Sequence, residues 1–444
     1  MFDNTIAIFG RLRVGLLSVA WVAALLQILT GDKFVWLVHI GLLAFVAFVA
    51  LTLTRLRRDT VVILLVLVVV AWALLDHFPT DDEWIAGGRY VLIFTALLPT
   101  MALVRATASL MPSVHRAQQA LAGLPESAST GGFHIAANIF GAVINTGALA
   151  ILSAALPDDA SEPQRRRAAE AALRGMVTAA AWSPFFVAFA IGQSFVGETA
   201  AWVAIAMGAV TSTVFALVSF RIFDRSFSFG QLKLALACLK PVLLRLSIVL
   251  GAVLSSALIF DFTAISAVVV VMPVLVLVQF ARYPRQITPI MTEVDRSMKA
   301  IADDIMIIGS AMLIGFFALR TGAFTALVSS FYAGVIPGWF ALTITPLAMM
   351  LLSVIGVHPV ISSTALMAVF SGGHAAVEPA LLMQAHLIGW GAGTMASVAS
   401  LSVIMSTSLY RVPSRQLALG PNLWSGFAYA LVGGAVLSFI NMAL

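Results

Sequence analysis

The sequence predicts an all-α polytopic membrane protein with about eleven transmembrane helices and two re-entrant hairpins. Hydrophobic residues make up 61% of the 444 residues and charged residues only 10%, whereas a soluble domain usually carries about 25% charged residues. Apolar runs close to the roughly 20 residues of a spanning helix recur along the chain. Two further apolar runs contain polar, Gly or Pro residues at their centres, which favours two half-length helices joined by a tip.

Apolar runs of spanning length occur at eleven places. They cover residues 14–30, 34–54, 60–78, 90–111, 171–195, 199–222, 241–260, 263–281, 304–321, 380–410 and 423–443. The first run lacks a small-residue cleavage site, so we interpret it as a membrane helix rather than a signal peptide. We expect the acidic residues 81–84 in an outer loop, and a cytoplasmic surface helix at residues 292–303, where charged and apolar residues alternate.

Basic residues set the expected orientation. Residues 133–156 and 336–371 are the predicted hairpins, and each returns to its own side of the membrane. With a cytoplasmic N-terminus, 22 of the 25 Lys and Arg residues then lie inside, Arg174 and Arg225 among them. A full crossing by either hairpin would carry basic loops outward, against the positive-inside rule. We therefore expect a bacterial inner-membrane protein with a periplasmic C-terminus.

The order of predicted elements repeats along the chain. Residues 1–33 hold an extra N-terminal helix, and residues 34–235 and 236–444 each contain three helices, a hairpin and two further helices. The first hairpin opens to the cytoplasm and the second opens outward, so the two halves have inverted topology. Many secondary transporters are built from such repeats.

Polar residues mark the tip of each predicted hairpin and the middle of the span that follows it. An unpaired backbone group in hydrocarbon costs several kcal/mol, so broken helices occur there only inside protein or beside a wet cavity. Free N–H groups at half-helix N-termini favour anions, and free carbonyl groups can hold a cation. We therefore predict a substrate and ion site that is made of Asn145, Thr146, Ser183, Pro184, His358, Pro359, Ser362, Ser363, Thr364, Thr394, Ser397 and Ser400.

Structural roles are the alternative for each of these residues. Helix–helix hydrogen bonds could explain Asn145 and Thr146, a simple kink could explain Pro184, and close packing could explain the small hydroxyl residues. Ionisable residues at membrane depth are costly, which favours a functional role for His358. His358 is also the candidate proton carrier, because histidine titrates near neutral pH. Structural or capping roles are favoured for His134, Asn138, Asp303, Asp304, Gln384 and His386.

With these elements the chain resembles the ion transporter superfamily, which includes divalent-anion/sodium symporters, arsenite permeases and membrane subunits of TRAP transporters. The resemblance covers nearly the whole chain. In the symporters, Ser-Asn-Thr motifs at the hairpin tips bind substrate carboxylate and help to form sodium sites. Here Asn145-Thr146 follows Ile144 instead of serine, and the second tip carries His358-Pro359. The resemblance implies alternating access and a homodimer, and the departures leave substrate and coupling ion open.

We expect an ion-coupled secondary transporter of a small anion, either a carboxylate or an oxyanion. The coupling ion is Na⁺ or H⁺, because the chain has no soluble domain large enough to bind ATP. Na⁺ can be held by carbonyl and hydroxyl groups alone. The alternative is the membrane subunit of a TRAP-like system, which would need a small membrane partner and a periplasmic binding protein.

Other function classes find less support in the sequence. A membrane-embedded transferase usually shows clusters of His, Asp, Glu or Arg within the membrane or at its surface, and no such cluster is evident. The single cysteine, Cys238, rules out an intrachain disulfide and makes a cysteine metal site very unfavourable. We predict no enzyme activity and no cofactor. The basic balance is typical of cytoplasmic loops, so we expect no nucleic-acid partner.

Overall fold

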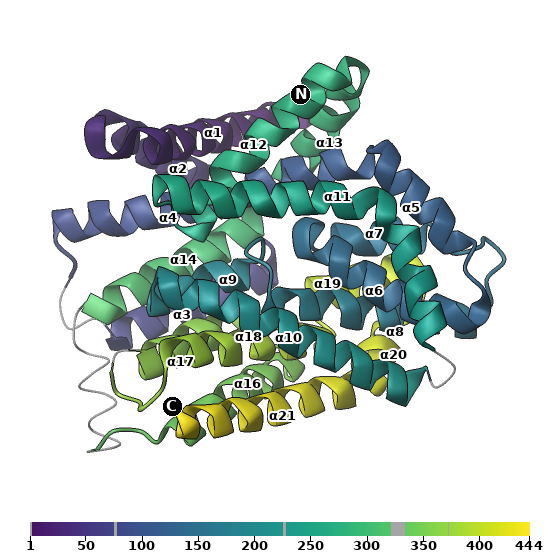
Figure 1. The fold of residues 1–444 in the computed structure, drawn as a ribbon. Helices are drawn as coiled ribbons and strands as arrows, with labels where there is room; N and C mark the ends of the chain where they lie inside the picture. The colour runs from purple at the N-terminus through teal and green to yellow at the C-terminus, as the bar shows by residue number, and fades with distance from the viewer. Residues whose placement is uncertain (1, 75–77, 225–227, 321–333, 372) are drawn as a thin grey trace. The chain divides into compact units, whose positions relative to one another are not determined.

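Every element that the computed structural model describes is a helix, apart from one isolated bridge between Ile336 and Ala375 (Figure 1). The described residues are 2–74, 78–224, 228–320, 334–371 and 373–444. Among them, seven helices are long and apolar enough to cross a membrane, or eight if one bent pair is a single span. The all-α class is confirmed, and these helices are consistent with a membrane protein. The number of spans and the re-entry of the hairpins stay predictions.

A few predicted positions lie outside the described residues. They are Arg225, residues 75–77 of the third predicted span and residue 321 of the ninth.

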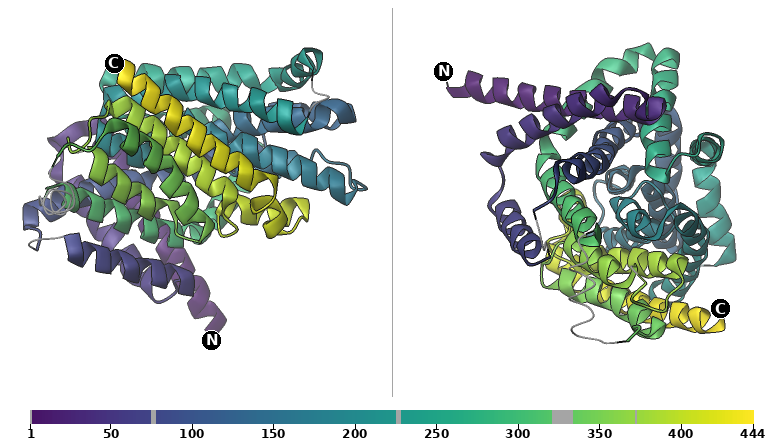
Figure 2. Two further views of the ribbon diagram at one scale, coloured as in Figure 1. Left: turned by 90° about the horizontal axis from the view of Figure 1, so that it is seen from below. Right: turned by 90° about the vertical axis from the view of Figure 1, so that its left-hand side faces the viewer.

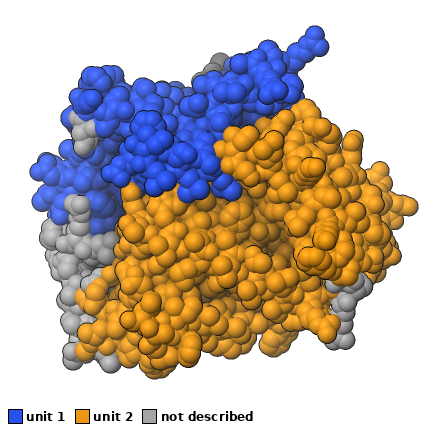
Figure 3. Space-filling view, viewed as in Figure 1, with its two compact units in different colours: residues 1–110, 249–327 blue, residues 111–248, 328–444 orange. Residues whose placement is uncertain are grey.

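The chain divides into two compact units, and each unit takes segments from both predicted repeats (Figure 3). Unit 1 comprises residues 1–110 and 249–327. A core around Leu17, Phe48, Leu103 and Val294 holds it together. Its helices are α1 (Phe2–Thr30), α2 (Val35–Leu53), α3 (Arg58–Leu74), α4 (Asp81–Ser109), the second part of α11 (Phe229–Phe260), α12 (Ala264–Arg282), α13 (Ile287–Ala300) and α14 (Ala302–Arg320).

Unit 2 comprises residues 111–248 and 328–444. Three of its helices, α16, α18 and α21, pack side by side (Figure 2) around a core that includes Leu342, Ala385 and Ala430. Its helices are α5 (Pro112–Ala122), α6 (Glu126–Ile144), α7 (Gly147–Ser153), α8 (Glu162–Thr178), α9 (Val187–Val196), α10 (Glu198–Phe223), the first part of α11, α16 (Gly338–Val354), α17 (Pro359–Ser371), α18 (Pro379–Ala396), α19 (Leu401–Tyr410), α20 (Ser414–Ala418) and α21 (Pro421–Ala443).

Helix α4 begins earlier than the hydrophobic pattern indicates. Residues 81–84, of which the first three are acidic, were expected in a loop but form the first turn of this helix, so the loop prediction is wrong. The reason is a capping box. The Thr80 N–H donates to the Glu83 carboxylate at 2.8 Å, and the Glu83 N–H donates to the Thr80 hydroxyl at 3.4 Å. Acidic side chains also suit the positive end of a helix dipole.

Two other boundaries differ from the prediction. Helix α11 begins at Phe229 instead of residue 241, because Pro241 lies inside a helix that starts in the charged segment before it. The short helix α5 was not anticipated. Its polar sequence hides an amphipathic pattern in which Val114, Ala117 and Leu121 are buried.

Helix α13 covers most of the surface helix predicted at residues 292–303, but it begins five residues earlier, and residues 302–303 belong to α14. Ile290, Val294 and Met298 recur every four residues and form its buried face. The exposed side carries charged side chains that pair within the helix, such as Arg296 with Glu293 at 2.9 Å.

Large apolar side chains are exposed on helices of spanning length. Examples are Leu43 on α2, Leu258 on α11 and Phe439 on α21, and Leu258 keeps 83% of its surface exposed. A protein in water rarely exposes so many of these groups together, whereas contact with lipid tails carries no such penalty. The surface therefore fits a membrane environment better than an aqueous one.

Candidate functional site

All twelve predicted site residues lie in unit 2, at two helix–turn–helix pairs and two interrupted helices. The pairs are α6–α7, joined at residues 145–146, and α16–α17, joined at residues 355–358. The interrupted helices are α8–α9, broken at residues 179–186, and α18–α19, broken at residues 397–400 and bent by 40°. The predicted tips and breaks thus coincide with real helix ends.

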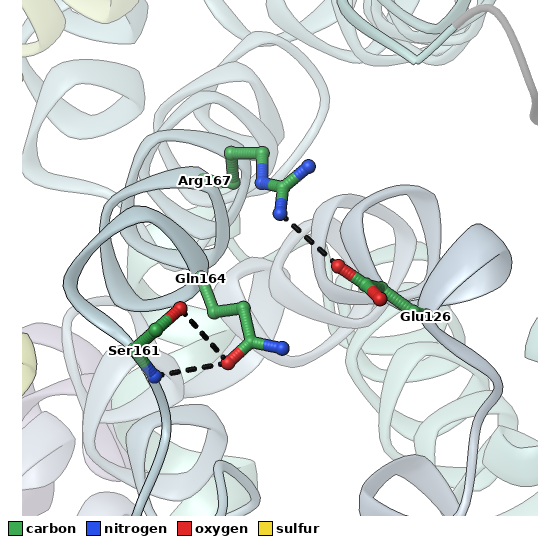
Figure 4. Close-up of polar contacts among 4 residues, drawn as sticks. All are labelled: Glu126, Ser161, Gln164 and Arg167. Atoms are coloured by element: carbon green, nitrogen blue, oxygen red, sulfur yellow. Dashed lines mark hydrogen bonds and ion pairs between the residues drawn. The ribbon is translucent and has the colours of Figure 1, made fainter.

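Helix α8, which leads into the first break, is anchored at its start (Figure 4). The Gln164 side chain reaches back to Ser161, whose N–H donates to Gln164 Oε1 at 2.9 Å. One turn further on, Arg167 Nη2 lies 3.1 Å from Glu126 Oε1 at the start of α6. These exposed contacts fix where α8 begins relative to the first helix pair.

Asn145 forms the turn between α6 and α7. Its backbone has a φ of +50°, an uncommon value for a residue other than glycine that asparagine tolerates better than most. Its N–H donates to the Gly141 carbonyl at 2.9 Å, and its carbonyl accepts from the Ala148 N–H at 3.0 Å. Asn145 is partly buried, and Thr146, which follows it in the same turn, is buried.

Ser183 ties the first break to the first helix pair. Its hydroxyl donates to the Ala142 carbonyl, one turn before the tip of α6, and accepts from the Phe185 N–H at 3.2 Å. The side chain is fully buried. It satisfies the Phe185 N–H inside the interruption around Pro184 and the Ala142 carbonyl in the last turn of α6. The break is therefore held in place by a side chain and not only by the proline.

Asn138 on α6 connects three elements around the same break. Its Nδ2 donates to the Gly175 carbonyl at 3.1 Å and to the Ser212 hydroxyl at 2.9 Å. Its Oδ1 accepts from Trp182 Nε1 at 3.3 Å. One amide thus links α6 to α8, α10 and the broken segment.

Ser400 has the corresponding role at the second break. Its hydroxyl donates to the Thr394 carbonyl at 2.6 Å and accepts from the Val403 N–H at 3.2 Å. It therefore joins the last turn of α18 to the first turn of α19, across the extended backbone of Ser397.

The two broken helices also share the turn that precedes the break. The Thr178 hydroxyl donates to the carbonyls of Arg174 and Gly175 at 2.8 and 3.1 Å. The Thr394 hydroxyl donates to the carbonyls of Trp390 and Gly391 at 2.9 and 3.1 Å. Each threonine thus bonds back to the residues four and three positions earlier. In α8 the break follows Thr178 directly.

This likeness has a sequence signal that hydropathy did not reveal. Both helices begin with Glu-Pro, at Glu162 and at Glu378, and 216 positions separate these residues, as they separate Thr178 from Thr394. Gly175 and Gly391 differ by the same 216 positions. A search for fixed-offset identities would have found the pair.

Glycines bring the two broken helices into backbone contact. A Cβ atom on Gly391 of α18 would lie 2.9 Å from the Val177 carbonyl of α8. A Cβ atom on Gly208 of α10 would lie 1.7 Å from the Ala181 carbonyl within the first break. Only glycine permits such approaches, as at small-residue helix crossings in membranes.

The second helix pair presents a local cap and an unpaired hydroxyl. His358 Nδ1 accepts from the Val360 N–H at 3.2 Å, and the Ser362 hydroxyl donates to the Pro359 carbonyl at 3.2 Å. Both contacts stay within the first turn of α17. Thr364 is only 9% exposed, and its hydroxyl has no hydrogen-bond partner among the described residues.

His386 was assigned a structural or interfacial place from the sequence, and it lies at the centre of a fully buried bridge. Its Nε2 is 2.8 Å from the Ala188 carbonyl of α9, and its Nδ1 is 3.2 Å from the Ser363 hydroxyl of α17. A carbonyl can only accept, so Nε2 carries the proton and Nδ1 accepts from the serine. The bridge connects α17, α18 and α9.

Arg174, which the charge count placed on the cytoplasmic side, is buried inside unit 2. Its side chain is 2% exposed inside unit 2, where Nη1 donates to Asn422 Oδ1 at 2.7 Å. The sequence signal was its position twelve residues into α8, between apolar residues and one turn before Thr178.

A cavity of about 610 Å³ lies elsewhere in unit 2. Its lining includes Glu198, Glu378, Leu381 and Leu444, and none of the twelve predicted residues. We do not place the site there, because the cavity walls are mostly apolar and the breaks lie outside it. Among the described residues, no group of three His, Cys, Asp or Glu side chains could hold a metal ion.

Comparison of the chain with models of known protein families and with characterised proteins gave no match. The functional argument therefore rests on the geometry of unit 2.

Proposed function

We propose that the chain is an ion-coupled secondary transporter of a small carboxylate or oxyanion that works by alternating access. One observation carries the proposal. Helices α8 and α18, one from each predicted repeat, are interrupted after the same threonine-stabilised turn and meet at Gly391 and Val177. Paired discontinuous helices at a repeat interface are where secondary transporters bind substrate.

The chemistry of the twelve residues suits an anion and a small cation. Side chains around the tips and breaks are neutral donors, and α9 and α19 each begin directly after a break, so that the positive end of each helix faces the interruption. The Thr364 hydroxyl is buried without a hydrogen-bond partner among the described residues, so it has a donor and an acceptor to offer to a ligand. Carbonyl groups in the breaks can hold Na⁺.

Sodium is the better-supported coupling ion. His358 Nδ1 already accepts from the Val360 N–H, so a proton on that nitrogen would remove the cap of α17. No carboxylate belongs to the twelve residues. A proton path through His358 is therefore less favourable than a sodium site.

The division into two units supports a moving part and a scaffold. Unit 2 collects both helix pairs and both interrupted helices, and unit 1 collects most of the other long apolar helices. We extend the proposal to inverted repeats with re-entrant hairpins, membership of the ion transporter superfamily, an inner-membrane homodimer and a cytoplasmic N-terminus.

A thermal-shift screen of the purified full-length chain tests the proposal. Mono-, di- and tricarboxylates and oxyanions are added in Na⁺ buffer and in K⁺ buffer. We expect at least one anion to raise the melting temperature in Na⁺ only. A hit then allows uptake to be measured in proteoliposomes with an inward Na⁺ gradient. Uptake that ignores the gradient would contradict coupling, and no stabilising anion would favour a partner-dependent system.

A further inference from the structure

We propose that unit 2 contains a second anion site, separate from the transported substrate, in which Arg174 of α8 and Asn422 of α21 bind a small inorganic anion such as chloride. This inference stands independently of the transport proposal.

Two direct contacts of the Arg174 guanidinium are with neutral groups. Its Nη1 donates to Asn422 Oδ1 at 2.7 Å, and the ring of Phe223 lies 4.3 Å from its central carbon. Arg174 is 2% exposed and Asn422 is fully buried. An amide and an aromatic face attract a cation but carry no net charge that could neutralise it.

The two acidic residues nearby accept hydrogen bonds from other donors. Glu170, one turn before Arg174 on α8, accepts from Arg166 Nε at 2.8 Å. Asp224, next to Phe223, accepts from the Gly131 N–H at 3.2 Å. Within the described part of the chain, no carboxylate lies at ion-pair distance from Arg174. Glu170 attracts Arg174 from one turn away, but it is hydrogen-bonded to Arg166 and leaves the Arg174 guanidinium without a carboxylate in direct contact among the described residues.

Two buried donors at this contact have no protein partner. Arg174 Nε and Asn422 Nδ2 are both unpaired among the described residues. Asn422 is the second residue of the 23-residue helix α21, whose first turn adds a positive partial charge. A buried donor without a partner destabilises the native state, and a bound anion would offset that cost. Donors from two helices and a helix start therefore select for negative charge.

The anion would fasten the helix that leads to the first break. Arg174 stands one turn before Thr178, and the Arg174 carbonyl accepts from the Thr178 hydroxyl at 2.8 Å. A ligand that holds Arg174 against α21 therefore also holds the last turn of α8. Loss of the anion would loosen this turn.

The test compares melting temperatures of the full-length chain in sodium chloride and in sodium gluconate at equal ionic strength. Saturating a site in the native state raises stability by about 2.7 kcal/mol at a hundredfold excess over Kd, which corresponds to roughly 3 °C or more. We expect this increment for the unaltered protein. We also expect it for Arg167→Gln, which removes an exposed arginine from the same helix.

Asn422→Asp supplies the counter-charge covalently and keeps the acceptor for Arg174 Nη1. It should melt in gluconate at least as high as the unaltered protein melts in chloride, and it should show no chloride increment. Arg174→Gln should also lose the increment. If Arg174→Gln does not fold, the result for Asn422→Asp alone tests the proposal. No chloride increment in the unaltered protein, or a full one in Asn422→Asp, would overturn the proposal. The readout needs no transport, so either outcome leaves anion transport to be judged separately.

Discussion

The Ser363 hydroxyl lies 3.2 Å from Nδ1 of His386, and both side chains are fully buried in unit 2. Replacing His386 with Phe would leave this hydroxyl and the Ala188 carbonyl without partners. Each buried unpaired group costs about 1–3 kcal/mol, so we expect a loss of about 2–5 kcal/mol. Chemical or thermal unfolding in detergent would measure it. His39→Phe is the control, because His39 is exposed on α2 and bonds only within its own helix.

Thr364→Val separates ligand binding from folding. The Thr364 hydroxyl has no protein partner among the described residues, so its removal should leave the melting temperature unchanged or slightly higher. The apparent affinity for the anion found in the ligand screen, measured from the rise in melting temperature that it causes, should fall at least tenfold. Thr213→Val, at an exposed hydroxyl on α10, should keep that affinity. Unchanged anion affinity in Thr364→Val would remove this residue from the site.

Gly208→Ala should damage the first break. The new Cβ would stand 1.7 Å from the Ala181 carbonyl, so α10 and the broken segment must separate. Overpacking of this kind costs typically about 1–3 kcal/mol, and more where backbone must move. Gly251→Ala on α11 meets nothing within 4 Å and should be neutral or stabilising. Equal melting temperatures for the two variants would show that the crossing is looser than described.

Ser183→Ala and Ser400→Ala should have similar effects, because each serine hydroxyl, itself in a break, donates to one carbonyl and accepts from one N–H. We expect each variant to lose about 1–3 kcal/mol and, in proteoliposomes, most of its uptake. Ser153→Ala, at a partly buried serine whose hydroxyl donates only to the preceding turn, is the control. Normal uptake in both variants would argue against the breaks as the binding region.

Asp303→Asn tests whether the charged start of α14 takes part in coupling. Asp303 pairs with Arg57 at 3.3 Å, but the Arg57 side chain is 61% exposed and is well screened by solvent. We expect a loss below about 1 kcal/mol that shrinks further in high salt, and unchanged sodium dependence. A changed sodium dependence of uptake would assign Asp303 a coupling role that its geometry does not indicate.

Local patterns carried most of the fold prediction. Apolar runs of spanning length located the long helices, because hydrophobicity is a property of consecutive residues. Boundaries were missed where polar residues start a helix, as at Glu83 in the capping box of α4 and at the charged beginning of α11. There the start of the helix is determined by capping and by tertiary packing, and neither is contained in an average of hydropathy over consecutive residues.

The candidate site divides in the same way. Tips and breaks were predictable because Asn145, Pro184 and the residues around His358 interrupt apolar runs locally. The His386 bridge was not, because its acceptor Ala188 is 198 positions away in the chain. Arg174 and Asn422 are 248 positions apart, and a single sequence holds no sign of that contact.

Helix α18 meets its neighbours through Gly389 and Gly393 on the side of α16 and through Gly391 on the side of α8. None of these residues has a rotamer to change. On the side of α16 the facing atoms include side-chain atoms of Met349 and Ser353, which can adjust, whereas Gly391 faces the Val177 carbonyl of α8. A displacement of α8 therefore meets backbone at this contact and must be passed on as a translation of the α18 backbone. Movement at the first break would thus reach α18, and with it the second break, through the contact between Gly391 and Val177.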